Sequence, residues 1–300
     1  YMIEQKSLLQ KIRYYTSRAI ARCLPDKVYL SIKFRTRFGY WMNWKHPQTY
    51  NEKLQWLKVY NRHEEFTQMV DKVAAKQFVK SIIGEKFIIA TIKVYNSADE
   101  INFEELPNQF VLKCTHDSGG IVVCNDKSKL DVVSARKKLA KLLKRTDVVQ
   151  NREYPYAKVP RRIIAEKYME DESGYELKDY KIFCFDGKPK FLFVASDRQK
   201  VGEDVKFDFF DLNWNHLPVL NGHANSLNKI PKPTNFEEMI QIAEKLSKGF
   251  RHVRVDLYNI NGQVYFGELT FFHFSGTQPF EHREWDYKFG AYLHLPTDDF

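Results

Sequence analysis

The fold and function of this chain are constrained most strongly by a pair of carboxylates inside an apolar hairpin. Residues 254–270 read RVDLYNINGQVYFGELT, two strand-like runs joined around Asn-Gly, a strong hairpin signal. Alternate side chains of a strand share a face, so Arg254 lies on the same face as Asp256. Placing Glu268 and Thr270 on that face requires a loop with an odd number of residues. We therefore predict a three-residue Ile-Asn-Gly loop, with Glu268 opposite Arg254 and diagonal to Asp256.

Two interpretations of this polar face are open. Its charges could form a salt bridge on a solvated sheet surface. Alternatively, an Asp/Glu pair holds Mg²⁺, whose remaining positions go to water and nucleotide phosphates. The choice depends on whether the rest of a nucleotide site is present in the sequence.

The composition is that of a globular protein, and we expect it to be cytoplasmic. The 300 residues are 43% hydrophobic, with only 13 Gly and 11 Pro, enough for one large domain or two modest ones. No apolar run approaches the roughly 20 residues of a membrane helix, and the first residues do not form a signal-peptide pattern. The four cysteines lack metal-ligand spacing, and we expect them to be free thiols. A disulfide between Cys114 and Cys124 across a hairpin is the alternative.

The net charge of +9 is concentrated at one end of the chain. Residues 1–46 contain ten Lys/Arg and two acids, whereas the other 254 residues hold 37 basic and 36 acidic groups. Residues 1–46 form a basic arm. This arm could make peripheral contact with the inner face of an anionic membrane, or with a lipid-linked glycan there. It could equally dock an apolar face on the body and leave its charges solvated. Because the body lacks a basic stripe, we expect no nucleic-acid partner.

Local patterns predict mixed helices and antiparallel strands, an α+β class. In chain order they are a helix begun by the Thr49–Glu52 capping box, a helix over 66–83, a strand over 86–95, a hairpin over 109–126, a helix capped by Asp131, a strand over 161–169, a hairpin over 179–196 that turns at Asp186-Gly187, a loop-rich stretch over 199–233, and a helix capped by Asn235 before the opening hairpin.

Further cations and glycines could complete a nucleotide site. Lys113 lies near the end of an apolar strand, and a Ser-Gly-Gly turn follows at 118–120. Glycines let backbone N–H groups approach phosphate oxygens, and a lysine adds a point charge. Lys181 alternates with Asp179 on a later strand, and Arg198 follows it. No P-loop pattern is present.

The order of these motifs resembles the ATP-grasp fold, over about residues 65 to 290. More closely, the chain resembles the TupA-like ATP-grasp branch, which is associated with bacterial surface polysaccharide synthesis. The phrases that carry this likeness are TYNEKLQWLK, DK at 71–72, LPNQFVLKCTHDSGG, DYKIFCFDGKP, RVDLYN and FGELTFF, while AEKYM matches the general ATP-grasp order. One departure is Thr270, where the general ATP-grasp pattern usually has an asparagine metal ligand.

The resemblance implies two α+β subdomains that sandwich ATP. We assign residues 1–65 to a basic helical arm, 66–170 to the N-terminal and first ATP-grasp subdomain, and 171–300 to the second subdomain with the metal site. The implied roles are Lys113, His116, Ser118, Gly119, Gly120 and Lys181 at the phosphates, Glu166, Lys167, Tyr168 and Met169 at adenine, Asp171 at the ribose, Asp256, Glu268 and Thr270 at Mg²⁺, and Lys181, Arg198 and Arg254 as catalytic groups.

The implied activity is that of an ATP- and Mg²⁺-dependent carboxylate–amine ligase, which forms an acyl phosphate and releases ADP. It would join an amino compound to a sugar carboxylate, such as a uronic acid. We expect residues 274–280, FSGTQPF, to contact this acceptor. Two alternatives are open: a phosphotransferase that acts on a sugar hydroxyl, and a non-catalytic basic binding protein.

Overall fold

The structure is a computed structural model that describes residues 16, 21–117, 120–145, 148–174, 176–197 and 204–296. Three predicted site residues, Ser118, Gly119 and Arg198, and most of the first twenty residues lie outside these ranges. Within the described residues, no helix is long and apolar enough to cross a membrane.

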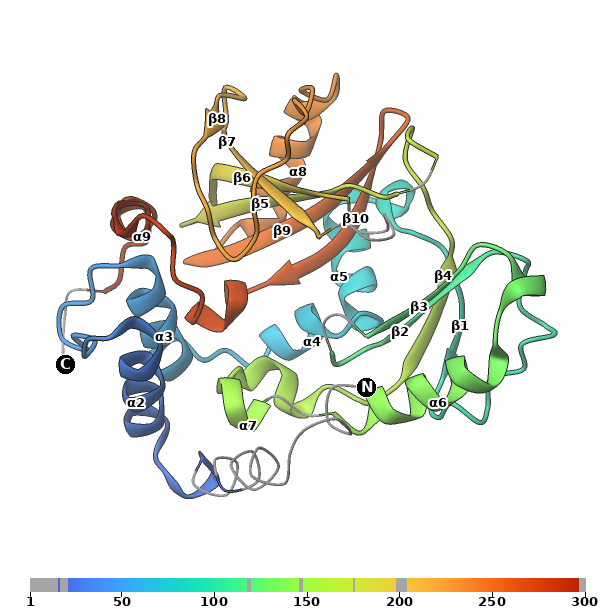
Figure 1. Ribbon diagram of the computed structural model, residues 1–300, viewed down its shortest axis with the longest axis horizontal. Helices are drawn as coiled ribbons and strands as arrows, with labels where there is room; N and C mark the ends of the chain where they lie inside the picture. The colour runs from blue at the N-terminus through green and yellow to red at the C-terminus, as the bar shows by residue number, and fades with distance from the viewer. Residues whose placement is uncertain are drawn as a thin grey trace.

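Two antiparallel sheets form the framework of the fold (Figure 1). The smaller sheet has the order β1-β4-β2-β3, and the larger has the order β10-β9-β5-β6-β7-β8. Helices lie between the two sheets and on their outer faces (Figure 1). The strands are β1 (Thr91–Tyr95), β2 (Phe110–Cys114), β3 (Ile121–Cys124), β4 (Ile163–Lys167), β5 (Asp179–Phe185), β6 (Lys188–Ser196), β7 (Lys206–Asp211), β8 (His216–Leu217), β9 (His252–Ile260) and β10 (Gln263–Thr270).

Each sheet has its own hydrophobic core. α6 packs on β2 and β3 in the smaller core, while α8 packs on β5, β6 and β9 in the larger one. α3 and α4 contribute to the larger core as well. The helices are α2 (Asp26–Phe38), α3 (Tyr50–Tyr60), α4 (Phe66–Val70), α5 (Ala74–Ile83), α6 (Val132–Leu143), α7 (Val148–Asn151), α8 (Phe236–Ser247) and α9 (Arg283–Ala291), with 3₁₀ turns η1 (Glu85–Phe87), η2 (Lys127–Lys129), η3 (Tyr154–Lys158) and η4 (His273–Gly276).

Within the basic segment, α2 is docked on the body of the protein. Leu30 and Phe34 are buried, each 1% exposed. The Lys33 ammonium donates to the Gln150 carbonyl oxygen at 2.7 Å. Arg37 donates to the Thr277 carbonyl oxygen at 2.9 Å. This part of the arm therefore docks its apolar face on the body as the second interpretation predicts, but Lys33 and Arg37 bind the protein instead of remaining solvated.

Several local predictions are confirmed by the structure. Thr49 and Glu52 form the capping box that begins α3, and the Asp131 side chain accepts from the Ser134 N–H at the start of α6. The four cysteines are free thiols. The side chain of Asn235 precedes α8 as predicted, but it bonds to the turn of the next hairpin instead of capping the helix.

Three predicted elements differ from the structure. The helix over 66–83 is broken between α4 and α5, where the Asp71 carboxylate binds the Val73 N–H and the Arg162 guanidinium. The strand over 86–95 begins as the 3₁₀ turn η1, and only its second half pairs as β1. The loop predicted over 199–233 contains β7 and β8. β7 was missed because Asp208 interrupts its aromatic run, yet that carboxylate is buried and accepts from the Ser226 N–H.

The predicted three-residue loop of the β9–β10 hairpin is wrong. The turn has two residues, Asn261 and Gly262, with φ of 50° and 81°. A bulge between Phe266 and Glu268 supplies the extra residue and keeps the polar positions on one face. A Cβ at Gly267 would lie 3.0 Å from the Asp256 carbonyl oxygen, so glycine suits the bulge.

This bulge changes the partners of the acidic pair. Glu268 lies opposite Asp256, and Thr270 lies opposite Arg254. On the other side of β9, Lys181 of β5 is also paired with Asp256. The correct register therefore places a lysine and a second carboxylate on either side of Asp256.

Candidate functional site

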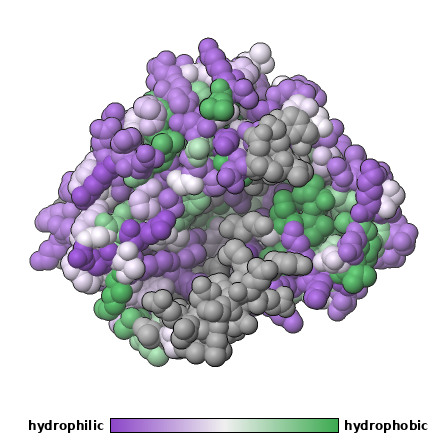
Figure 2. Space-filling view, viewed as in Figure 1, coloured by the Kyte–Doolittle hydropathy of each residue, from purple (hydrophilic) through white to green (hydrophobic). Residues whose placement is uncertain are grey.

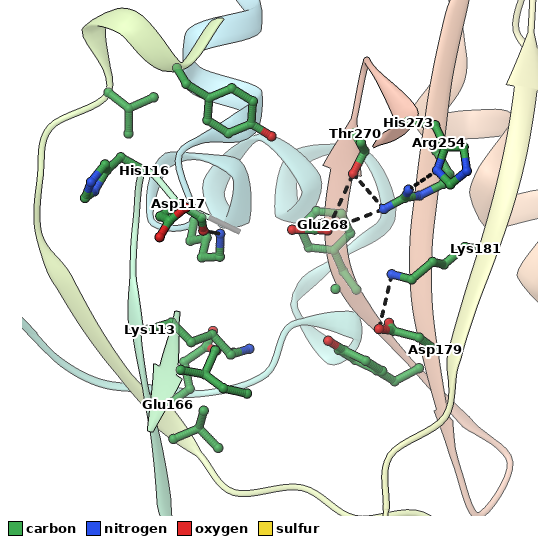
Figure 3. Close-up of a pocket in the computed structure, with 18 of the residues that line it drawn as sticks. Lys113, His116, Asp117, Glu166, Asp179, Lys181, Arg254, Glu268, Thr270 and His273 are labelled. Carbon is green, nitrogen blue, oxygen red and sulfur yellow. Dashed lines mark hydrogen bonds and ion pairs between the residues drawn. The ribbon is translucent and has the colours of Figure 1, made fainter. Parts of the chain in front are cut away.

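A cavity of about 870 Å³ lies between the two sheets. Figure 2 shows this face of the molecule hollowed between its two halves, and Figure 3 shows side chains extending into the cavity from opposite walls. The predicted site residues that line it are Lys113, His116, Glu166, Lys167, Tyr168, Met169, Lys181, Arg254, Glu268 and Thr270.

The wall formed by the smaller sheet carries a lysine pair around one carboxylate. Glu166 of β4 is 5% exposed and binds Lys113 of β2 at 2.8 Å and Lys76 of α5. Burial favours the neutral acid, but the two lysines outweigh it and lower the pKa of Glu166. Burial lowers the pKa of Lys76. The three side chains together leave one positive charge, and Lys113 presents its ammonium to the cavity (Figure 3).

The wall formed by the larger sheet contains a buried ion cluster around Asp256. This residue is fully buried, and Arg254 donates to its carboxylate through Nε at 2.6 Å and through Nη2 at 2.7 Å. Lys181 binds the same carboxylate and also lies 3.1 Å from Asp179. Burial lowers the pKa of Lys181. Burial acts in the same sense on Arg254, but Asp256 outweighs it and raises the pKa of the guanidinium. The cluster keeps two cations beside the cavity, and Asp256 and Asp179 balance their charge.

The Arg254 guanidinium is oriented by three further groups. It donates to His273 Nδ1 at 2.8 Å and to Thr270 Oγ1 at 3.0 Å, and it lies 3.5 Å from Glu268. A guanidinium can only donate, so Nδ1 of His273 is the acceptor and its proton is on Nε2. That Nε2 donates a hydrogen bond to Asn221 Oδ1 at 2.9 Å. Burial, with Arg254 adding to it, lowers the pKa of His273 well below 6.5, so this histidine is a neutral positioning group.

The two predicted carboxylate ligands are in different environments. Asp256 does not line the cavity, because both of its oxygens face the Arg254 and Lys181 cations. Glu268 has a side chain that is 34% exposed and points into the cavity, with Thr270 Oγ1 3.5 Å away (Figure 3). Among the described residues, no three His, Cys, Asp or Glu side chains form a metal-binding group.

These donors fit a nucleotide-bound Mg²⁺ better than a metal held by protein alone. Mg²⁺ is commonly bound through one or two carboxylates, with substrate phosphates and water in its other positions. Glu268 supplies one partly exposed carboxylate, and the Thr270 hydroxyl lies beside it. Cations on both walls suit the phosphates of the same ligand.

Apolar and aromatic side chains line part of the cavity around β2 and β4. They are Ile89, Val111, Tyr168, Met169 and Leu177. Such side chains suit a planar, largely apolar group such as a purine base.

Two other predicted residues have local partners. Asp171 does not line the cavity, because its carboxylate closes a turn by accepting from the Ser173 N–H at 2.9 Å and from the Lys178 ammonium at 2.9 Å. His116 lies on the first wall, and its Nε2 donates to the Arg145 carbonyl oxygen at 3.2 Å. Gly120, at the end of the predicted glycine loop, does not line the cavity.

Sequence reasoning missed part of the lining. The segment 151–159, which contains η3, supplies Asn151, Glu153 and Tyr156 to the cavity. These residues belong to no spaced motif, and they reach the site because η3 packs on α4. Phe274, Ser275 and Thr277 also line the cavity, within the segment predicted to contact an acceptor.

Comparison of the sequence with models of protein families shows the family of this chain. The model of the TupA-like ATPgrasp family matches residues 52–294. The chain belongs to the TupA-like ATP-grasp family. The predicted α+β ATP-grasp fold is thereby confirmed.

Solved ATP-grasp structures are similar to this family member at low identity. D-alanine–D-alanine ligase from Bacillus anthracis complexed with ATP has 15% identity and a TM-score of 0.40, covering 67% of this chain and 54% of that one. L-amino acid ligase from Bacillus licheniformis has 12% identity and a TM-score of 0.46, covering 75% of this chain and 49% of that one. This chain thus spans about half the length of each. No curated protein matches it.

Proposed function

We propose that this protein is an ATP- and Mg²⁺-dependent ligase that joins an amino compound to the carboxylate of a sugar acid, such as a uronic acid. The product would belong to a bacterial capsule or surface polysaccharide. Family membership supports the use of ATP. The observation that carries the proposal is the pair of facing walls, with Lys113 on one side and Lys181, Arg254 and Glu268 on the other.

Each group has a role that its environment supports. Lys113 and Lys181 would hold the phosphates, and Glu268 with Thr270 would hold Mg²⁺, which neutralises phosphate charge during transfer. The apolar lining around Met169 would take the adenine base. Arg254 would attract the sugar carboxylate through its positive charge, since its paired Nε and Nη2 donors already bind Asp256.

The reaction needs positioning of charge more than protein nucleophiles. A carboxylate oxygen of the sugar acid attacks the γ-phosphorus of ATP, the bond to the bridging oxygen breaks, and ADP leaves. The amine then attacks the acyl carbon, the carbon–oxygen bond to phosphate breaks, and phosphate and a proton are released. Buried cations that are already in place stabilise the charge that develops in both steps.

Product analysis tests the proposal. The protein is incubated with ATP, Mg²⁺, a panel of uronic acids, and hydroxylamine in place of the unidentified amine. A ligase produces ADP, free phosphate and a sugar hydroxamate in equal amounts. Phosphate retained on the sugar would instead indicate a phosphotransferase. Absence of any ATP binding would contradict both activities and favour a binding protein.

A further inference from the structure

Phe274 is held over the cavity in a strained conformation. Its φ is 45°, and that of Ser275 is 57°, in the left-handed region that bulky side chains rarely adopt. The ring is 38% exposed, whereas the preceding Phe272 and His273 are each 3% exposed. Backbone strain of this kind persists only where the surrounding structure fixes it, and it is concentrated at ligand sites.

Two buried side chains of α3 fix this turn. Gln55 Nε2 donates to the carbonyl oxygens of Ser275 at 3.0 Å and Gly276 at 2.6 Å. The Lys58 ammonium donates to the Ser275 carbonyl oxygen at 2.8 Å and to its hydroxyl at 2.7 Å. Gly276 is required, since a Cβ there would lie 2.5 Å from Gln55 Nε2. The Phe274 backbone is therefore preset rather than adjusted by ligand.

Phe274 ends an aromatic wall that begins at the reaction centre. The Arg254 guanidinium lies 5.9 Å from the Phe193 ring, and Phe193 stacks on Phe207 with ring centroids 4.2 Å apart. Phe274 is nearly parallel to Phe207, at 6.0 Å and 16°. All four residues line the main cavity. Aromatic faces suit the apolar C–H face of a sugar ring, whose hydroxyls point outward.

A second cavity of about 390 Å³ adjoins this wall. His223 lines it, and the His223 ring lies 4.2 Å from Phe207 and 6.2 Å from Phe274. Gln278 and Pro279 also line it. The second cavity thus begins where the aromatic wall of the first ends.

The walls of the second cavity are tied to the reaction centre. Asn221 is 1% exposed, and its Nδ2 donates to the carbonyl oxygens of Gln278 and Pro279 at 3.2 Å each. Its Oδ1 accepts from His273, the residue that orients Arg254. The side-chain amide of Asn221 therefore connects the wall of the second cavity to His273 and, through it, to Arg254.

A cation of α2 binds one lining residue of each cavity. Arg37 of α2 donates through Nε to the Thr277 carbonyl oxygen at 2.9 Å and through Nη2 to Gln278 Oε1 at 2.9 Å. Thr277 lines the first cavity and Gln278 the second. Because a guanidinium has five N–H donors, Arg37 keeps further donors for an anionic ligand.

We propose that the acceptor is an acidic saccharide chain of several rings, which runs from Arg254 over Phe274 into the second cavity. One ring stacks on Phe274, and Arg37 binds a carboxylate of a neighbouring ring. This inference rests on the proposed function, and it specifies that the acceptor is a chain and not a single sugar acid.

The test compares acceptors of different length. The probes are oligogalacturonates and oligoglucuronates of one, two and four rings, with ATP, Mg²⁺ and hydroxylamine. We expect kcat/KM for hydroxamate formation to rise by at least about tenfold from one ring to four, the size of one stacking contact. In Phe274→Ala this ratio should fall to near one, whereas Phe274→Tyr should keep it. Tyr287→Ala is the matched control, since Tyr287 is exposed on α9 and lines neither cavity.

A second variant separates charge from packing. Arg37→Gln should weaken binding of the four-ring probe and reduce its salt dependence. Equal kcat/KM for one and four rings in the wild type would overturn the inference. So would Phe274→Ala if it lowered both values equally, because that outcome indicates a structural role alone. If ATP binds but no uronate of any length gives hydroxamate, the proposed function itself fails and the inference falls with it.

Discussion

The two acidic residues that face each other across β9 and β10 should fail in different ways when neutralised. Asp256 is fully buried between Arg254 and Lys181, so Asp256→Asn leaves two buried cations without their shared anion. Breaking a buried ion pair costs about 3–5 kcal/mol of folding stability. At about 2 °C per kcal/mol for a chain of this size, the Tm should fall by roughly 6–10 °C.

Glu268→Gln is the matched control for this prediction. Its side chain is 34% exposed, and its ion pair with Arg254 is 3.5 Å long. A pair of this kind contributes about 0–1 kcal/mol, so we expect little change in Tm. Thermal unfolding at pH 7 without nucleotide measures both variants under the same conditions. A larger loss of stability in Glu268→Gln than in Asp256→Asn would refute the assignment of Asp256 to the buried cluster.

Three further changes have expected outcomes. Lys113→Met should weaken ATP binding in calorimetry by about 10- to 100-fold, the worth of a charged hydrogen bond, whereas Lys93→Met, an exposed lysine outside the cavity, should not. Burial lowers the pKa of Lys58 from 10.5 to about 7, so the unfolded chain binds a proton that the folded chain lacks. Wild-type stability should therefore rise from pH 7 towards pH 10 by up to about 1.4 kcal/mol per unit, and urea unfolding of Lys58→Met should lose that slope. Gly290→Ala should cost about 1–3 kcal/mol or more in the same assay, because its Cβ would lie 2.4 Å from the Gln48 carbonyl oxygen.

Features that depend on a few neighbouring residues were predictable from the sequence. The capping box of Thr49 and the Asp131 cap were found because both partners lie within three residues. The hairpin at Asp186-Gly187 was found because φ values of 48° and 74° favour these two residue types. The family resemblance placed Lys113 and Lys181 in one site, which no local pattern could establish.

Features set by distant partners were not predictable in the same way. The bulge at Gly267 depends on the close approach of the Asp256 backbone. From the sequence alone, the odd number of residues needed between the strands was assigned to the turn. The ion cluster around Asp256 could not be predicted, because the pairing of β5 with β9, which brings Lys181 to it, cannot be read from the hairpin. The lining supplied by segment 151–159 likewise depends on tertiary packing.

ATP binding with and without Mg²⁺ tests the central claim that this cavity is a nucleotide site built from both sheets. Calorimetry compares the wild type with Lys113→Met and Glu268→Gln. Lys113 lies on the wall of the smaller sheet, and Glu268 lies on the wall of the larger sheet at the proposed metal position. We expect one ATP site per chain whose affinity Mg²⁺ increases, weaker binding in Lys113→Met, and loss of the Mg²⁺ effect in Glu268→Gln. Binding that is absent in the wild type, or unchanged in both variants, would contradict it.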